Sequence, residues 1–169
     1  MVSPPPPGVI NPIFYDVGRL NREVANLGQS LRFMTSTDVR IVPGPGRDAL
    51  PQIPVWEPGA GETPEILDIT IKDLESDDWK DLLIGFFTAD DGEQYFMITN
   101  LWHGMDRSAR QRQLSVTLKL APGVKAVGRL LRETGRPELL AVPNGRLELV
   151  LPGGTGELLR LGDAEFPGL

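Results

Sequence analysis

The hydrophobic period of this sequence changes once along the chain, and that change constrains the fold more than any other feature. Between Ile13 and Leu31 apolar residues recur every three or four positions, which is the spacing of one face of an α-helix. From Asp38 onward they fall in short runs, several of them strictly alternating, separated by Gly, Pro, Asp-Gly and Asn-Gly signals that favour turns. We therefore predict a mainly β fold: an antiparallel β-sandwich of about eight strands with one N-terminal amphipathic helix.

The helix is the most strongly indicated element. Pro12 suits its first turn, and Gly28 either weakens or caps its last turn. The apolar stripe must pack on the sheet or on a neighbouring molecule, and its spacing resembles a coiled-coil seam. Self-association through this stripe is therefore one candidate, although fewer than three heptads make an isolated coiled coil marginal. The candidate contact residues are Ile13, Val17, Leu20, Val24 and Leu27.

With 169 residues, the chain is long enough for one ordinary domain. Residues 1–11 lack the basic and apolar segments of a signal peptide, and their run of prolines is typical of a linker, so we expect a Pro-rich linker or the edge of a longer polypeptide. Residues 12–35 are expected to form the helix, which either ends a missing barrel or clamps onto one, and residues 36–169 the β-sandwich domain. The Pro/Gly-rich segment 43–64 is expected to be a long loop.

The expected strands are short runs of apolar and β-branched residues between turn signals. They are Asp38–Val42, Ile66–Ile71, Leu82–Thr88, Gln94–Asn100, Leu114–Leu120, Ala126–Leu131, Glu138–Val142, Arg146–Leu151 and Glu157–Leu161.

Charge and composition narrow the function classes. The net charge is −6 without an extended basic cluster, which argues against nucleic acid as a partner because such binding relies on Lys and Arg. No apolar stretch approaches the roughly 20 residues of a membrane-spanning helix, so we expect no membrane segment. The absence of Cys excludes disulfides, zinc–thiolate sites and thiol nucleophiles but leaves the compartment open. We expect no cofactor and no metal.

Candidate catalytic groups are scarce. His103 is the single histidine and has no Cys or neighbouring Ser partner, so a structural role is favoured. The acidic run 73–78 does not have the spacing of a calcium-binding loop, and Asp90, Asp91 and Glu93 fit the chemistry of a hairpin turn. The glycine clusters lack the Lys and Ser/Thr of a phosphate loop. We expect that this chain is not an enzyme on its own.

Aromatic residues offer a weaker possibility. Exposed rings can stack on sugar faces, and Trp56 and Trp102 lie in expected loops. We consider Trp56, Trp102 and Tyr95 as candidate carbohydrate contacts. The alternative is that Trp79 and Tyr95 serve core or edge packing.

Two stretches resemble the C-terminal part of (β/α)₈-barrel glycoside hydrolases. The segment 14–28 (Phe-Tyr-Asp-Val-Gly-Arg-Leu-Asn-Arg-Glu-Val-Ala-Asn-Leu-Gly) resembles the last barrel helix as it exits toward the C-terminal domain. The segments 95–101, 116–118, 124–127, 132–135 and 153–156 resemble the β-sandwich that follows such barrels. This resemblance implies an accessory domain that packs on a catalytic barrel, with the two catalytic carboxylates on the barrel and none in this chain.

Overall fold

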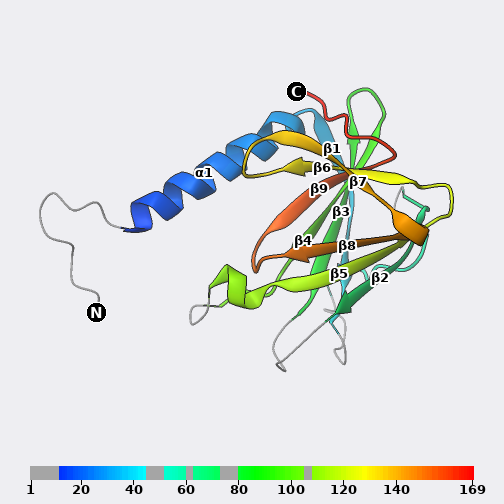
Figure 1. Ribbon diagram of the computed structural model, residues 1–169, viewed down its shortest axis with the longest axis horizontal. Helices are drawn as coiled ribbons and strands as arrows, with labels where there is room; N and C mark the ends of the chain where they lie inside the picture. Colours follow the sequence, from blue (N-terminus) through cyan, green and yellow to red (C-terminus); the bar gives the residue numbers. More distant parts are fainter. Residues whose placement is uncertain (1–11, 45–51, 60–62, 73–79, 105–107) are drawn as a thin grey trace, which may run out of the picture.

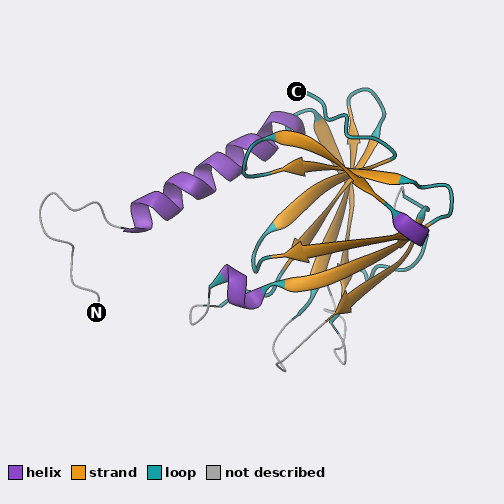
Figure 2. Ribbon diagram, in the orientation of Figure 1, coloured by secondary structure: helices purple, strands orange, loops and turns teal. Residues whose placement is uncertain are grey.

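The computed structural model describes residues 12–44, 52–59, 63–72, 80–104 and 108–169. These residues form one helix and two antiparallel sheets, drawn in Figures 1 and 2, so the predicted fold class is confirmed. Two short 3₁₀ turns, Ala109–Arg112 and Pro143–Gly145, lie between strands. The elements are α1 (Pro12–Leu31), β1 (Met34–Val42), β2 (Ile66–Lys72), β3 (Leu82–Ala89), β4 (Gln94–Asn100), β5 (Leu114–Leu120), β6 (Ala126–Leu131), β7 (Arg136–Ala141), β8 (Arg146–Leu151) and β9 (Gly156–Leu161).

The two sheets differ in size. The larger has the strand order β1-β3-β4-β9-β6-β7, and the smaller has the order β2-β5-β8. Nine strands are present in the described residues, one for each of the nine runs expected from the sequence and close to the predicted sandwich of about eight strands. The helix ends at Leu31, and β1 begins at Met34, before both the expected strand and the domain boundary drawn at residue 36. Met34 pairs with Ala89, so the partner strand extends β1 through Thr and Ser residues that have little apolar signal of their own.

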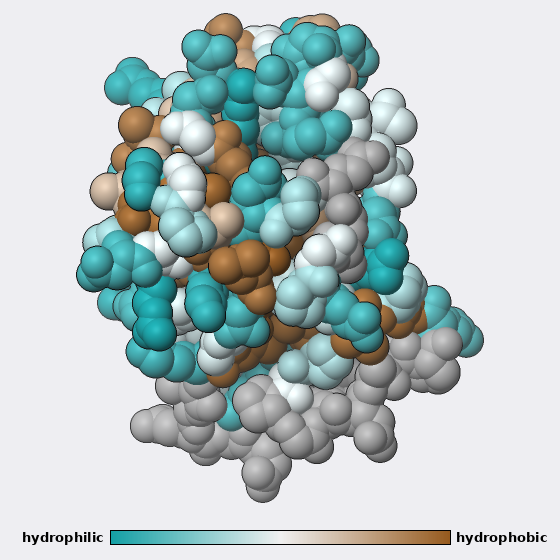
Figure 3. All heavy atoms as spheres, turned by 90° about the vertical axis from the view of Figure 1, so that its right-hand side faces the viewer, coloured by the Kyte–Doolittle hydropathy of each residue, from teal (hydrophilic) through white to brown (hydrophobic). Residues whose placement is uncertain are grey.

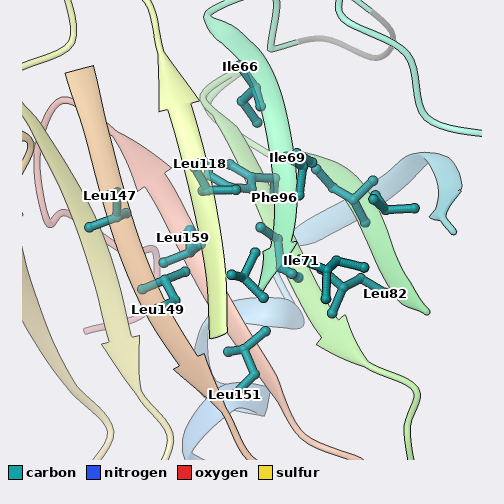
Figure 4. Close-up of a cluster of buried hydrophobic side chains, with 14 of the residues drawn as sticks. Ile66, Ile69, Ile71, Leu82, Phe96, Leu118, Leu147, Leu149, Leu151 and Leu159 are labelled. Carbon is teal, nitrogen blue, oxygen red and sulfur yellow. The ribbon is translucent and has the colours of Figure 1, made fainter. Parts of the chain in front are cut away.

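The main core lies between the two sheets. In β5 and β8 every second side chain points inward, as expected for strands with one buried and one solvated face. Figure 4 shows side chains of the small sheet meeting those of the large sheet in this layer. Its labelled members are Ile66, Ile69 and Ile71 from β2, Leu82 from β3, Phe96 from β4, Leu118 from β5, Leu147, Leu149 and Leu151 from β8, and Leu159 from β9.

A second, smaller core covers the other face of the large sheet. Tyr95 and Leu158 each precede a main-core residue on the same strand, so they point to the opposite face. There they pack with Leu130 and Phe166. The end of α1 and the segment after β9 provide the cover, because the small sheet lies on the far side.

The last residues of the chain are tied to this second core. The Tyr95 Oη atom donates to the Glu165 carbonyl oxygen at 3.1 Å, and the Tyr95 ring lies 5.7 Å from the Phe166 ring. Burial raises the pKa of Tyr95, although the neighbouring Arg160 guanidinium acts in the opposite direction. The raised pKa keeps the phenol protonated, so that it can donate this hydrogen bond. Gly168 lies close to the C-terminal end of α1, hereafter the root of α1. A Cβ at Gly168 would come within 2.5 Å of the Gln29 carbonyl oxygen.

One buried amide joins the two sheets at the end of β4. Asn100 is fully buried, and its Nδ2 atom donates to the carbonyl oxygens of Arg112 and Leu151, each at 2.9 Å. Its Oδ1 atom accepts from the Trp102 backbone N–H at 2.8 Å. Leu151 ends β8 of the small sheet, so this side chain spans the two layers and satisfies three backbone groups.

Candidate docking site

The first half of α1 projects away from the β-sandwich (Figure 1). We call this projecting half, residues 12–24, the arm. Its large apolar side chains are exposed to an extent that is unusual for an amphipathic helix of a folded domain. The exposed fractions are 64% for Ile13, 67% for Phe14, 49% for Val17, 56% for Leu20 and 61% for Val24.

The polar side of the same helix is the side that faces the body. Glu23 is 8% exposed and Ser30 is fully buried. The Asn26 Nδ2 atom donates to the Arg132 carbonyl oxygen at 2.7 Å, in the turn between β6 and β7. Gly135 favours this approach: residues with a side chain rarely adopt its φ of +67°, and a Cβ there would lie 3.1 Å from Asn26 Oδ1.

Arg132 is the centre of a buried ion cluster that joins α1 to the sheet. Its guanidinium lies 3.2 Å from a carboxylate oxygen of Glu23, 3.1 Å from one of Glu133 and 3.4 Å from one of Glu157. Arg19 adds a second cation on Glu23, at 3.1 Å. Burial raises the pKa of Glu157, and the nearby Arg132 opposes that shift without cancelling it.

Helix geometry separates the apolar and anchoring sides. At about 100° per residue, the residues Ile13, Val17, Leu20 and Val24 form one narrow stripe, hereafter the stripe. The anchoring residues Glu23, Asn26 and Ser30 point roughly a quarter to two-fifths of a turn away from the centre of the stripe. The helix therefore contacts its own domain through these polar side chains and, at its C-terminal end, through Leu27 and Leu31, while the stripe is left uncovered, which is unlike ordinary helix packing.

The exposed face is wider than the stripe. On the side away from the anchor, the stripe is flanked by Phe14 and by the small or uncharged residues Asn21, Ala25 and Gly28. The face without charges therefore spans roughly 140° of the helix. A two-stranded coiled coil needs only a narrow seam, whereas a helix that packs into a larger surface has a stripe of roughly 100° or more.

The three aromatic residues considered as carbohydrate contacts are buried. Trp56 is 8% exposed, Trp102 is 5% and Tyr95 is 1%. Trp56 and Trp102 do lie outside strands, but Lys80 and Arg112 stand 5.7 Å and 5.6 Å from the Trp102 ring. The structure thus places these rings in packing positions and brings none of them to an exposed face where a sugar ring could stack.

The other residues singled out in the sequence are not gathered into one site. His103 is exposed in the loop after β4. Asp91 Oδ1 accepts from the Glu93 backbone N–H at 3.1 Å, and Gly92 has a φ of +89°, so this segment is the predicted hairpin turn. Glu93 pairs with Arg160. The acidic run 73–78 and Trp79 lie outside the described residues.

No cluster of three potential metal ligands occurs in the described part of the chain. Within the same residues, no helix is long and apolar enough to span a membrane. The body surface opposite the arm is mixed, with apolar patches among polar ones (Figure 3). No family model, curated protein or solved structure matches the chain.

The sequence predicted the apolar stripe of the helix but not the polar contacts that hold the helix against the sheet. In the sequence, Glu23 is an ordinary residue on the polar face of a predicted helix, and Arg132 and Glu157 lie in segments far from it along the chain. Nothing in the spacing of these three residues relates them to one another. Only the fold brings α1, the β6–β7 turn and β9 together around one guanidinium.

Proposed function

We propose that this chain is a non-catalytic accessory β-sandwich domain of a larger glycoside hydrolase, and that it docks on the catalytic barrel through the stripe. The observation that carries the proposal is this unusual packing of α1, with Glu23 and Ser30 buried while Leu20 and Val24 are exposed. A helix gains by burying its apolar face. The partner would supply that cover and would hold the domain against its flank.

The exposed area supports a large partner. At about 150 Å² for a large side chain, the exposed fractions leave roughly 75–100 Å² uncovered on each of Ile13, Phe14, Val17, Leu20 and Val24, or about 450 Å² in all. At ~25 cal/mol per Å² the gross gain from covering it is about 10 kcal/mol. A stable interface buries about 800 Å² per partner, so the arm supplies about half of one.

A (β/α)₈ barrel fits these requirements. Its outer ring of helices has grooves between neighbouring helices, and a face roughly 140° wide can lie in such a groove where the side chains that line it are apolar. The arm begins at Pro12, so a domain that precedes α1 in the same polypeptide would be connected to the N-terminal end of the stripe through residues 1–11. Covalent linkage raises the effective concentration of the two surfaces to the millimolar range and compensates for the modest contact area.

The first test is to read the coding sequence that adjoins this one. A barrel with paired Asp or Glu residues at its strand ends supports the proposal. The parent polypeptide is then compared with its Leu20→Glu and Val24→Glu variants by calorimetry. We expect the two substitutions to separate the unfolding of barrel and sandwich and to lower the barrel transition. A parent without a barrel, or one whose unfolding ignores both substitutions, contradicts the proposal.

The chain alone provides the control. Because Leu20 and Val24 are exposed, replacing each with Glu should change the free energy of unfolding of the isolated chain by no more than ~0.5 kcal/mol. Leu27→Glu, in contrast, places a charge against the second core and should destabilise the chain by more than 1 kcal/mol, about the centre of the range for point mutants. Equal losses in all three variants would mean that the stripe packs on its own domain.

Self-association through the stripe is the competing use of the same surface. The wide uncharged face favours a groove over a narrow two-helix seam, so we expect the isolated chain to sediment as a monomer. If the isolated chain is instead a dimer, and Leu20→Glu dissociates this dimer without unfolding the chain, then the partner of the stripe is a second copy of the chain and not a barrel. We assign no sugar contact to Trp56, Trp102 or Tyr95, since all three rings are buried.

A further inference from the structure

We propose that Arg132 is a positioning residue that fixes the direction in which the arm leaves the body. This inference rests on the proposed function only for the purpose of the arm, which is docking on a barrel. Its physical content concerns the isolated chain, in which α1 is placed by directional polar contacts so that the apolar stripe remains available.

Apolar packing at the root of α1 is too limited to set a direction. Leu27 and Leu31 are partly buried against the second core, and they are the α1 residues that join that cluster. Val24, one turn before them, is already 61% exposed. Contacts between apolar surfaces are non-directional, so these two leucines hold the end of the helix but contribute little to the direction of its far end.

The Arg132 cluster supplies the missing direction. A guanidinium is planar and presents its N–H groups in a fixed fork, so its partners must lie in set places. Here its partners come from three segments: Nη1 donates to Glu157 from β9, Nη2 pairs with Glu133 from the β6–β7 turn, and Nε forms an ion pair, without hydrogen-bond geometry, with Glu23 from α1. The Arg132 backbone adds a fourth link, because its carbonyl oxygen accepts from Asn26. Glu23 and Asn26 lie almost one turn apart, so the two contacts fix both the tilt and the rotation of the helix.

Burial gives this cluster its strength. Arg132 is 9% exposed, Glu23 8% and Glu157 6%, so solvent screens their interactions weakly. The neighbouring Arg129–Glu138 pair joins β6 to β7, and in the described residues its hydrogen bonds and ion pair do not involve α1, so it serves as a control, although it is more exposed. A docking helix that is already held in its bound direction loses less conformational freedom when its partner arrives.

The test measures the direction of the arm in the isolated chain. The sequence has no cysteine, so spin labels can be attached at Asn21→Cys on the arm and Lys119→Cys on β5, both exposed positions. Double electron–electron resonance then reports the distribution of distances between the labels. We expect a single narrow maximum in the otherwise unchanged chain. Arg132→Met and Glu23→Gln should each replace it with a broad, displaced distribution.

Controls separate positioning from general loss of structure. Arg129→Met should keep the narrow maximum, and Arg132→Lys, which retains the charge but not the fork, should restore it in part. Circular dichroism shows whether Arg132→Met folds. If it does not fold, Glu23→Gln decides the question, because it alters only the helix side of the cluster. A narrow, unshifted maximum in Glu23→Gln would overturn the proposal. Failure to find a barrel partner would leave this result untouched and would count against the proposed function alone.

Discussion

Asn100→Asp is a nearly isosteric change that should strongly destabilise the domain. The wild-type amide donates two hydrogen bonds, to the carbonyl oxygens of Arg112 and Leu151, and accepts one from Trp102. A carboxylate can keep the accepted bond but can donate neither of the others. Each buried carbonyl left without a donor costs about 1–3 kcal/mol, so two of them give a loss of about 4 kcal/mol. That is a large share of the ~5–15 kcal/mol that stabilises an ordinary domain.

The pH dependence of this variant provides a second check. The position is fully buried, so burial should raise the pKa of the introduced carboxyl well above that of an exposed Asp. Below that raised pKa the neutral acid can donate one hydrogen bond again. The penalty relative to wild type should therefore shrink as the pH falls toward 4 and reach its full size near pH 7.

Urea unfolding at several pH values, followed by tryptophan fluorescence, measures both quantities. The exposed substitution Asn21→Asp serves as the control and should change the free energy of unfolding by no more than about 0.5 kcal/mol. A loss below ~1 kcal/mol at pH 7 for Asn100→Asp, or a loss that is the same at every pH, would refute the assignment of this amide as a donor that joins the sheets.

Two further predictions concern the segment after β9 and the ion cluster. Gly128→Ala should release the C-terminal residues, because a Cβ at Gly128 would come within 1.9 Å of the Asp163 carbonyl oxygen; faster amide exchange in residues 162–169 would show this, and unchanged exchange would contradict it. Since burial raises the pKa of Glu157 in the folded state, its contribution to stability is complete below the ordinary pKa and is lost as the pH rises through the raised value. Glu157→Gln should therefore remove part of the fall in stability above about pH 4.5, and pH profiles of variant and wild type that run parallel would exclude this.

Alternation and turn chemistry were sufficient to predict most strands. β4, β5, β6 and β8 have the predicted bounds, since each is an apolar run closed by strong turn or breaker signals. The fold class followed from these local patterns. The strand order did not, because the placement of β9 between β4 and β6 depends on contacts between segments far apart in the chain.

The burial of the loop tryptophans has the same explanation. Trp56 is drawn in by a short parallel bridge, in which its backbone N–H donates to the Ile41 carbonyl oxygen at 2.8 Å. Trp102 is held beside the buried Asn100, to which its backbone N–H donates, and two cationic side chains, Lys80 and Arg112, lie within 5.7 Å of its ring. A loop position predicts exposure only when nothing else in the fold approaches it, and the sequence of the loop does not contain that information.

The contact between Gly168 and the root of α1 means that the helix can complete its contacts with its own domain only at the end of synthesis. The helix is made first, yet its root packs against the final residues, and Arg132 gains Glu157 only when β9 has joined the sheet. Translation proceeds from the N-terminus at about 5–20 residues per second, so the helix waits for the rest of the domain. During that interval its apolar stripe can meet only what has already been synthesised. A domain encoded before it would thus have the first opportunity to cover the stripe, before any part of the β-sandwich exists.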